Sequence, residues 1–187
     1  MQKERKRNVR RGGTAMFRKA KQDDIAAVAD IYKQIHEQES AGLVKIGWLP
    51  GVYPVEQTAQ DAYKRDDLFV CEEDGEILAA AIINQTQVDV YADGKWMYPA
   101  ADEEVMVLHT LVVDPRKGKR GIGKAFVAFY EQYAAGKGCK LLRMDTNEKN
   151  VRARAMYKKL GYREADIVPC EFNGIPGVQL VLLEKRL

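Results

Sequence analysis

The chain has 187 residues and a formal net charge of +3, a length that suits one well-packed domain and is short for two. No apolar run reaches the roughly 20 residues that a membrane span needs, and no signal-peptide pattern is present, so we expect a cytoplasmic protein without a membrane partner. The cysteines Cys71, Cys139 and Cys170 share no ligand-like spacing, so we predict reduced thiols and no metal site.

The basic charge lies at the start of the chain. Residues 1–15 hold six Lys or Arg side chains against one Glu, so residues 16–187 sum to −2. We interpret residues 1–15 as a basic, disordered leader and residues 16–187 as a single domain. A basic arm can bind nucleic acid, but no aromatic residues are interleaved here for base stacking, so the pattern disfavours that partner.

The first half of the domain predicts a strand, two helices and a hairpin, over residues 16–20, 23–35, 54–64 and 68–83. The first helix has an apolar face at helical spacing, formed by Ile25, Val28, Ile31, Tyr32 and Ile35. An irregular stretch over 40–54 separates the two helices. The segment 84–103 is too long for a hairpin loop, and we regard it as a candidate substrate wall.

The second half predicts a strand, loop and helix over about 104–136, then a strand over 140–145, a helix over 150–161 and an antiparallel pair over 162–168 and 177–183. The longest of these helices has one apolar face, formed by Ile122, Phe126, Phe129, Tyr130 and Tyr133. The order of elements predicts an α+β fold with a central mixed, mostly antiparallel sheet flanked by helices.

A basic, glycine-rich loop, Gly118-Lys-Arg-Gly-Ile-Gly-Lys124, joins the central strand to the long helix. This arrangement aims backbone N–H groups and a helix N-terminus at one point, which makes an anion site. The loop matches the nucleoside-triphosphate P-loop except at Ala125, where that motif needs Ser or Thr to hold Mg²⁺. A dinucleotide-binding loop needs a third glycine where Phe126 stands.

Two motifs together resemble the GNAT superfamily of N-acetyltransferases, which bind acetyl-CoA. The first is Leu111-Val-Val-Asp-Pro115 followed by Gly121-Ile-Gly123, and the second is Asn150-Val-Arg-Ala-Arg-Ala-Met-Tyr-Lys-Lys-Leu-Gly-Tyr162. The order of elements over residues 16–187 supports the resemblance. It implies the acyl-CoA N-acyltransferase fold and acetyl transfer from acetyl-CoA to a primary amine by direct attack on the thioester.

The resemblance also implies which residues contact the cofactor. Its pyrophosphate would be held by the loop residues Gly118, Lys119, Arg120, Gly121, Ile122, Gly123 and Lys124. Its pantetheine would lie against Leu111, Val112 and Val113, whose backbone N–H groups would stabilise the oxyanion. The family loop usually has Arg or Gln where Gly118 stands, and Arg116, Lys117 or Arg120 could supply that charge.

Two residues of the second motif have implied roles. Tyr157 is placed where the family positions the acid that protonates the departing thiolate. It would also serve as a core aromatic of the last helix. Asn150 caps that helix and would contact CoA.

The general base is less well specified. His109 lies in the central strand and has a suitable ordinary pKa of about 6.5. Simple alternation puts it on the same face as Leu111 and Val113, as a buried histidine, whereas a bulge would turn it toward the substrate. Glu104, or its neighbour Glu103, acting through a water molecule is the alternative.

The acceptor is expected between the stretches 40–54 and 84–103. Their aromatic residues would either line the site or form a local core: Trp48, Tyr53, Tyr91, Trp96 and Tyr98. A polyamine, an amino acid, an aminoglycoside and a protein N-terminus remain open, and so do a monomer and a homodimer. The rival hypotheses are a P-loop nucleotide-binding protein and a nucleic-acid-associated protein with a degenerate acetyl-CoA domain.

Overall fold

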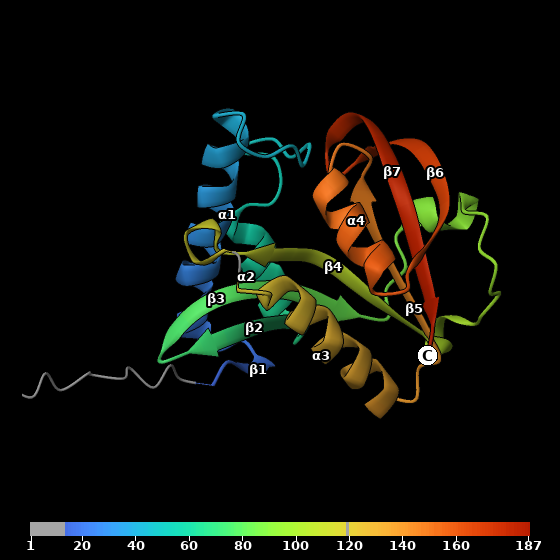
Figure 1. Ribbon diagram of the computed structural model, residues 1–187, viewed down its shortest axis with the longest axis horizontal. Helices are drawn as coiled ribbons and strands as arrows, with labels where there is room; N and C mark the ends of the chain where they lie inside the picture. Colours follow the sequence, from blue (N-terminus) through green and yellow to red (C-terminus); the bar gives the residue numbers. More distant parts are fainter. Residues whose placement is uncertain (1–13, 119) are drawn as a thin grey trace, which may run out of the picture.

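Seven strands in the part of the chain that the structure describes form one mixed sheet (Figure 1). The computed structural model describes residues 14–118 and 120–187. The sheet order is β1-β2-β3-β4-β5-β7-β6, with β1 Met16–Lys19, β2 Leu68–Glu73, β3 Glu76–Asn84, β4 Val105–Val113, β5 Leu141–Asn147, β6 Arg163–Phe172 and β7 Ile175–Arg186. Only the β4–β5 pair in this sheet is parallel. The predicted α+β class with a central mixed sheet is confirmed.

Helices cover both faces of the sheet: α1 Ile25–Ser40, α2 Glu56–Lys64, α3 Ile122–Gly136 and α4 Val151–Lys159. The two faces are visible along β3, where Ala80 and Ile82 pack with α1 and α2 while Ala79 and Ala81 pack with α3 and α4. Because β3 is buried on both faces, its sequence is a continuous apolar run. Among the described residues, no helix has the length and apolar character needed to cross a membrane.

The sheet splits between β4 and β5. These strands pair in register only from Val105–Leu141 to Leu108–Met144, and each then continues without the other. On its other side, β4 pairs His109 with Ile82 and Val112 with Ala80, so two residues of β4 oppose one of β3. The resulting bulge centres on Thr110, whose φ of 50° lies in the left-handed region. The split and the bulge together leave one edge of β4 open to the cleft described below.

Most of the segment 84–103 does not line the cleft, although its length and aromatic content predicted a substrate wall. Its aromatics Tyr91, Trp96 and Tyr98 pack into a separate cluster with residues of β5 and β7. The reason is a buried guanidinium: Arg143 lies 4.0 Å from the Trp96 ring centroid and donates to the Tyr98 carbonyl at 3.1 Å. The segment is therefore held against the sheet, and only its first residues reach the cleft.

Candidate active site

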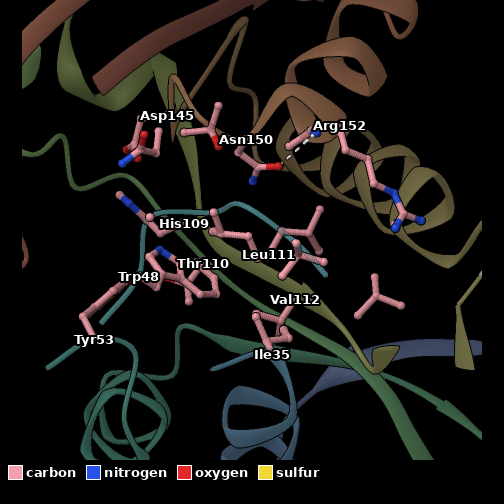
Figure 2. Close-up of a pocket in the computed structure, with 18 of the residues that line it drawn as sticks. Ile35, Trp48, Tyr53, His109, Thr110, Leu111, Val112, Asp145, Asn150 and Arg152 are labelled. Atoms are coloured by element: carbon pink, nitrogen blue, oxygen red, sulfur yellow. Dashed lines mark hydrogen bonds between the residues drawn. The ribbon is translucent and has the colours of Figure 1, made fainter. Parts of the chain in front are cut away.

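A cleft of about 1310 Å³ opens where β4 and β5 separate (Figure 2). One end lies between the N-termini of α3 and α4, and the other lies beside the segment that joins α1 to α2. Figure 2 shows His109 and Asp145 toward one end of this space and Arg152 toward the other. A single continuous cleft can therefore hold an elongated ligand and bring a second molecule to its end.

The α3 end has the geometry of an anion site. A 3₁₀ turn over Pro115–Lys117 follows β4, and Gly121 takes a left-handed φ of 74° immediately before α3. Asp114 fixes the turn, since its carboxylate accepts hydrogen bonds from the backbone N–H and the guanidinium of Arg116, both at 2.9 Å. Burial would raise the pKa of Asp114, but these hydrogen bonds hold it below its ordinary value. The start of α3 and its free N–H groups thus face the cleft.

The predicted loop residues fall into two groups. Those that line the cleft are Gly118, Arg120, Gly121, Ile122, Gly123 and Lys124, whereas Lys119 lies outside the described residues. The basic side chains offered in place of the missing loop Arg or Gln are each paired with carboxylates: Arg116 with Asp30 and Asp114, Lys117 with Glu76, and Arg120 with Glu73. The charge missing at Gly118 is therefore not simply restored by its neighbours.

Arg152 is a cationic group that the sequence reasoning missed. It lies in the first turn of α4, lines the cleft, and has no ion pair among the described residues. A cation at a helix N-terminus is disfavoured by the helix dipole, so Arg152 does not serve the stability of α4. Its position opposite the start of α3 suits contact with an anionic ligand. The signal in the sequence was an arginine two residues after the cap Asn150.

The β4 bulge shapes the middle of the cleft. The side chain of Val112 is buried in the core beneath α1, while Leu111 and Val113 pack toward α3. All three residues line the cleft. Because β4 has no paired partner on its β5 side beyond Leu108, its backbone donors and acceptors there are available to a ligand.

His109 lines the cleft next to the bulge and is held by a hydrogen-bonded chain. Its Nε2 lies 3.1 Å from Asn84 Oδ1, and Asn84 Nδ2 donates to Asp67 Oδ2 at 3.0 Å. Because Asn84 Oδ1 is an acceptor, Nε2 of His109 carries the hydrogen in this pair. Burial lowers the pKa of His109 to about 4, so the ring is neutral at physiological pH.

The second predicted motif places its residues on α4 as expected. Asn150 caps the helix by accepting the Ala153 backbone N–H at 3.2 Å, and it also lines the cleft. Tyr157 is buried and lines the cleft, and among the described residues its hydroxyl has no hydrogen-bond partner. Burial raises the pKa of Tyr157 well above its ordinary range, so the phenol is protonated and can donate.

Asp145 is an ionisable residue of the cleft that the sequence analysis did not single out. It lies on β5, across the split from His109, and Tyr91 donates its hydroxyl hydrogen to Oδ2 at 2.8 Å. Burial raises the pKa of Asp145 to about 6, and no cation pairs with it among the described residues. The available signal was one acidic residue within the predicted strand over 140–145.

Glu104 does not reach this site. It ends a 3₁₀ turn before β4 and lies 3.5 Å from Lys140 Nζ in an ion pair. The bulge at Thr110 is six residues further along the strand, a separation of roughly 20 Å. Glu104 is absent from the lining of the cleft, so the expectation that it acts on the acceptor finds no support in its position. The described residues also contain no group of three or more His, Cys, Asp or Glu side chains placed to hold a metal ion.

The comparisons with known proteins agree with this geometry. The family described as "Acetyltransferase (GNAT) family" matches residues 14–162. An uncharacterised N-acetyltransferase of Methanocaldococcus jannaschii is 31% identical over 107 residues, which is 56% of this chain and 43% of the relative. The chain thus spans less than half of the length of that relative.

The solved structures that share the fold include the following two. A GNAT-family acetyltransferase of Streptococcus agalactiae superimposes with a TM-score of 0.75 and 22% identity, over 92% of this chain and 95% of the other. The Salmonella typhimurium acetyltransferase yncA, solved with its cofactor acetyl-CoA, gives a TM-score of 0.65 and 15% identity, over 92% and 94%.

Proposed function

The chain belongs to the GNAT family of acetyltransferases and is an N-acetyltransferase, and from that premise we propose that it transfers the acetyl group of acetyl-CoA to a primary amine by direct attack on the thioester. The observation that carries the proposal is the cleft at the β4–β5 split. It joins a helix N-terminus suited to an anion with a carboxylate suited to an ammonium group, that of Asp145, which has no cation partner among the described residues.

The cofactor would occupy the cleft lengthwise. Its phosphates would meet the N–H groups at the start of α3 and the guanidinium of Arg152. Its pantetheine would lie along the unpaired edge of β4, where backbone groups substitute for a neighbouring strand. Backbone N–H groups near Leu111 would then stabilise the oxyanion, a contact typically worth about 3–4 kcal/mol.

The proton transfers can be assigned to two residues. Asp145 removes one proton from the acceptor ammonium, and the neutral amine attacks the thioester carbonyl carbon. The carbon–sulfur bond then breaks, and Tyr157 gives its proton to the departing thiolate. The amide nitrogen loses its second proton to the Tyr157 oxygen. The overall balance is one amide, one CoA thiol and one proton that leaves through Asp145.

Asp145 suits the role of base better than His109. A base works best when its pKa lies near the working pH, and the pKa of Asp145 is raised to about 6 whereas that of His109 is lowered to about 4. The Nε2 of His109 is also committed to Asn84. We assign His109 a positioning role, as a neutral group beside the acceptor amine.

The test is calorimetric titration of the full chain with acetyl-CoA, with Mg-ATP as a parallel titrant. We expect micromolar binding of acetyl-CoA and none of ATP, followed by amine-dependent thiol release with a panel of primary amines. Binding of ATP without acetyl-CoA would contradict the proposal and favour a P-loop-type nucleotide site. The absence of both would contradict it as well.

A further inference from the structure

We infer that the acceptor is a small monoamine with an apolar body, because residues 46–53 close over the acceptor end of the cleft. These residues, named the roof segment here, lie between α1 and α2 and reach across toward β5 and the β6–β7 turn (Figure 1). The inference rests on the proposed acetyl transfer and specifies the substrate of that same site.

The roof segment is firmly attached to the α1 side of the cleft. The carboxylate of Glu39 on α1 accepts backbone N–H groups from Ile46 at 2.9 Å, Gly47 at 2.5 Å and Trp48 at 3.3 Å. His36 Nε2 donates to the Pro54 carbonyl at 2.9 Å just beyond the segment. Charge-assisted hydrogen bonds of this kind order a loop, so the roof segment behaves as a wall.

The roof segment also meets the other half of the molecule. A Cβ atom built on Gly47 would lie only 2.8 Å from Asn147 Cγ on β5, which shows how closely the backbone approaches that side chain. At the far end, a Cβ on Gly174 in the β6–β7 turn would contact Val52 Cγ1 at 3.4 Å. The hydroxyl of Tyr53 is hydrogen bonded to Thr110 at the β4 bulge. Contacts on both sides therefore bridge the cleft.

One side of the space beneath the roof segment is apolar. Its walls include Trp48, Phe172, Ile175, Val178 and Leu180, and the packing of Trp48 against this β7 cluster joins the two halves. Such walls bind a hydrocarbon or aromatic body by removing it from water.

One carboxylate in this space is available to an ammonium group. Of the acidic residues that line the described cleft, Asp114 is bound to Arg116, and Asp61 accepts from Gln57 and lies 3.9 Å from Lys64. Asp145 has no cation partner among the described residues. A single carboxylate without a cation partner matches a single ammonium group, whereas a polyamine or an aminoglycoside would bring several cations against the apolar side of this space at high cost.

A polypeptide fits this space poorly. An extended chain carries backbone donors and acceptors at every residue, and each must find a partner when it is buried. The side chains of Phe172, Ile175, Val178 and Leu180 offer no such partner, and the contacts at Gly47 and Val52 obstruct a chain laid across the opening. A peptide N-terminus is therefore the alternative that the experiment must exclude.

The first experiment is a competition. The full chain is incubated with acetyl-CoA and equal concentrations of 2-phenylethylamine, spermidine and a tripeptide with a free N-terminus, and the acetylated products are measured by mass spectrometry. We expect 2-phenylethylamine to be favoured at least about 100-fold in kcat/KM, the scale of selectivity that a shaped pocket provides. Faster acetylation of spermidine or the tripeptide would overturn the inference. So would a chain that binds acetyl-CoA but acetylates none of the three, and in that case the proposed function would survive.

The second experiment tests the roof segment with matched glycine variants. Gly47 and Gly51 both have left-handed φ values, 87° and 75°, so an alanine strains the backbone at either position. Only at Gly47 does the new methyl group meet Asn147, because a Cβ on Gly51 has nothing within 4 Å. We expect Gly47→Ala to raise KM for 2-phenylethylamine about tenfold more than Gly51→Ala does, because Gly47 lines the cleft and Gly51 does not. Acetyl-CoA affinity should be the same in the two variants, since the phosphates bind at the other end of the cleft.

The double variant Gly47→Ala/Asn147→Ala serves as the rescue. Removal of the Asn147 amide makes room for the new methyl group, so KM should return toward the wild-type value. Equal KM values for Gly47→Ala and Gly51→Ala would overturn the inference, since backbone strain alone would then account for both. The melting temperature of each variant verifies that the domain is folded in the comparison.

Discussion

Tyr91 donates its hydroxyl hydrogen to Asp145 Oδ2 at 2.8 Å, across a sequence separation of 54 residues. This hydrogen bond comes from the 84–103 segment, whose aromatics otherwise pack away from the cleft. It fixes one carboxylate oxygen and leaves Oδ1 without a hydrogen-bond partner among the described residues. The 84–103 segment thus contributes to the site because Tyr91 orients the carboxylate of Asp145.

Replacement of that carboxylate should separate activity from cofactor binding. We expect Asp145→Asn to lower kcat by about 10²–10⁴, the usual contribution of a general base. Acetyl-CoA affinity should stay within about twofold, since the phosphates bind at the other end of the cleft. Wild-type kcat/KM should rise with pH up to about 6, where Asp145 loses its proton, and then level off. A variant with wild-type kcat would exclude Asp145 as the base.

The same variant should be more stable than the wild type at neutral pH. Because the folded-state pKa of Asp145, about 6, exceeds its ordinary value of 3.8, the native protein favours the protonated carboxyl. The stability that the protonated Asp145 contributes is therefore present at low pH and is lost as the pH rises through about 6. Asn cannot ionise and can still accept from Tyr91, so Asp145→Asn should raise the free energy of unfolding by about 3 kcal/mol at pH 7.5. Urea denaturation at pH 4 and 7.5 measures the difference, which should vanish at the lower pH.

His109 should influence stability in the opposite direction. Its folded-state pKa of about 4 lies below the ordinary 6.5, so the native protein excludes the charged ring. The stability that depends on a neutral His109 is present above pH 6.5 and is lost as the pH falls to about 4. The free energy of unfolding should fall between pH 7 and pH 4 in both proteins. We expect this fall to be about 2–3 kcal/mol smaller for His109→Gln than for the wild type, as measured by urea denaturation.

His109→Gln also tests the choice of base. Gln can donate to Asn84 as the histidine does, so a positioning role predicts a loss in kcat of no more than about tenfold. A loss as large as that of Asp145→Asn, together with removal of the acidic limb of the pH profile, would transfer the base role to His109.

The hydroxyl of Tyr157 should matter for chemistry and not for folding. Because it has no hydrogen-bond partner among the described residues, Tyr157→Phe should leave the melting temperature unchanged within about 2 °C. We expect kcat to fall about 10²-fold, measured by thiol release at saturating acetyl-CoA. Tyr162→Phe is the matched control, since Tyr162 lies 6.0 Å from Tyr157 between ring centroids and donates instead to Glu131. Equal losses in the two variants would exclude the acid role.

Arg152 should contribute to cofactor affinity through its charge. We expect Arg152→Ala to weaken acetyl-CoA binding about tenfold, or about 1.4 kcal/mol, with a smaller effect at high salt. Arg154→Ala is the control on the same helix, because Arg154 is paired with Glu164 and is not among the cleft-lining residues. Calorimetric titration at two salt concentrations measures both, and equal affinities for the two variants would contradict the assignment.

The sequence identified the parts of the site whose chemistry is local. A glycine loop before an amphipathic helix, and an Asn cap seven residues before Tyr157, are short-range patterns that predict the α3 and α4 termini directly. Alternation and turn residues likewise predicted the hairpins, and the order of elements gave the α+β class. Family membership follows from the same local motifs.

Long-range pairing decided the rest. Asp145 becomes a candidate base only because β4 and β5 separate beyond Leu108 and burial raises its pKa, which no local pattern reveals. Glu104 lies far from the cleft because it precedes β4, where it pairs with Lys140. Trp96 does not line the cleft because the buried Arg143 holds its ring against the sheet. By itself the sequence determined which residues can form helices, strands and an anion loop, since those depend on neighbours within a few positions. Only the tertiary structure decided that Tyr91 meets Asp145 and that the roof segment approaches β5 and the β6–β7 turn, because these contacts join residues about 50 to 120 positions apart.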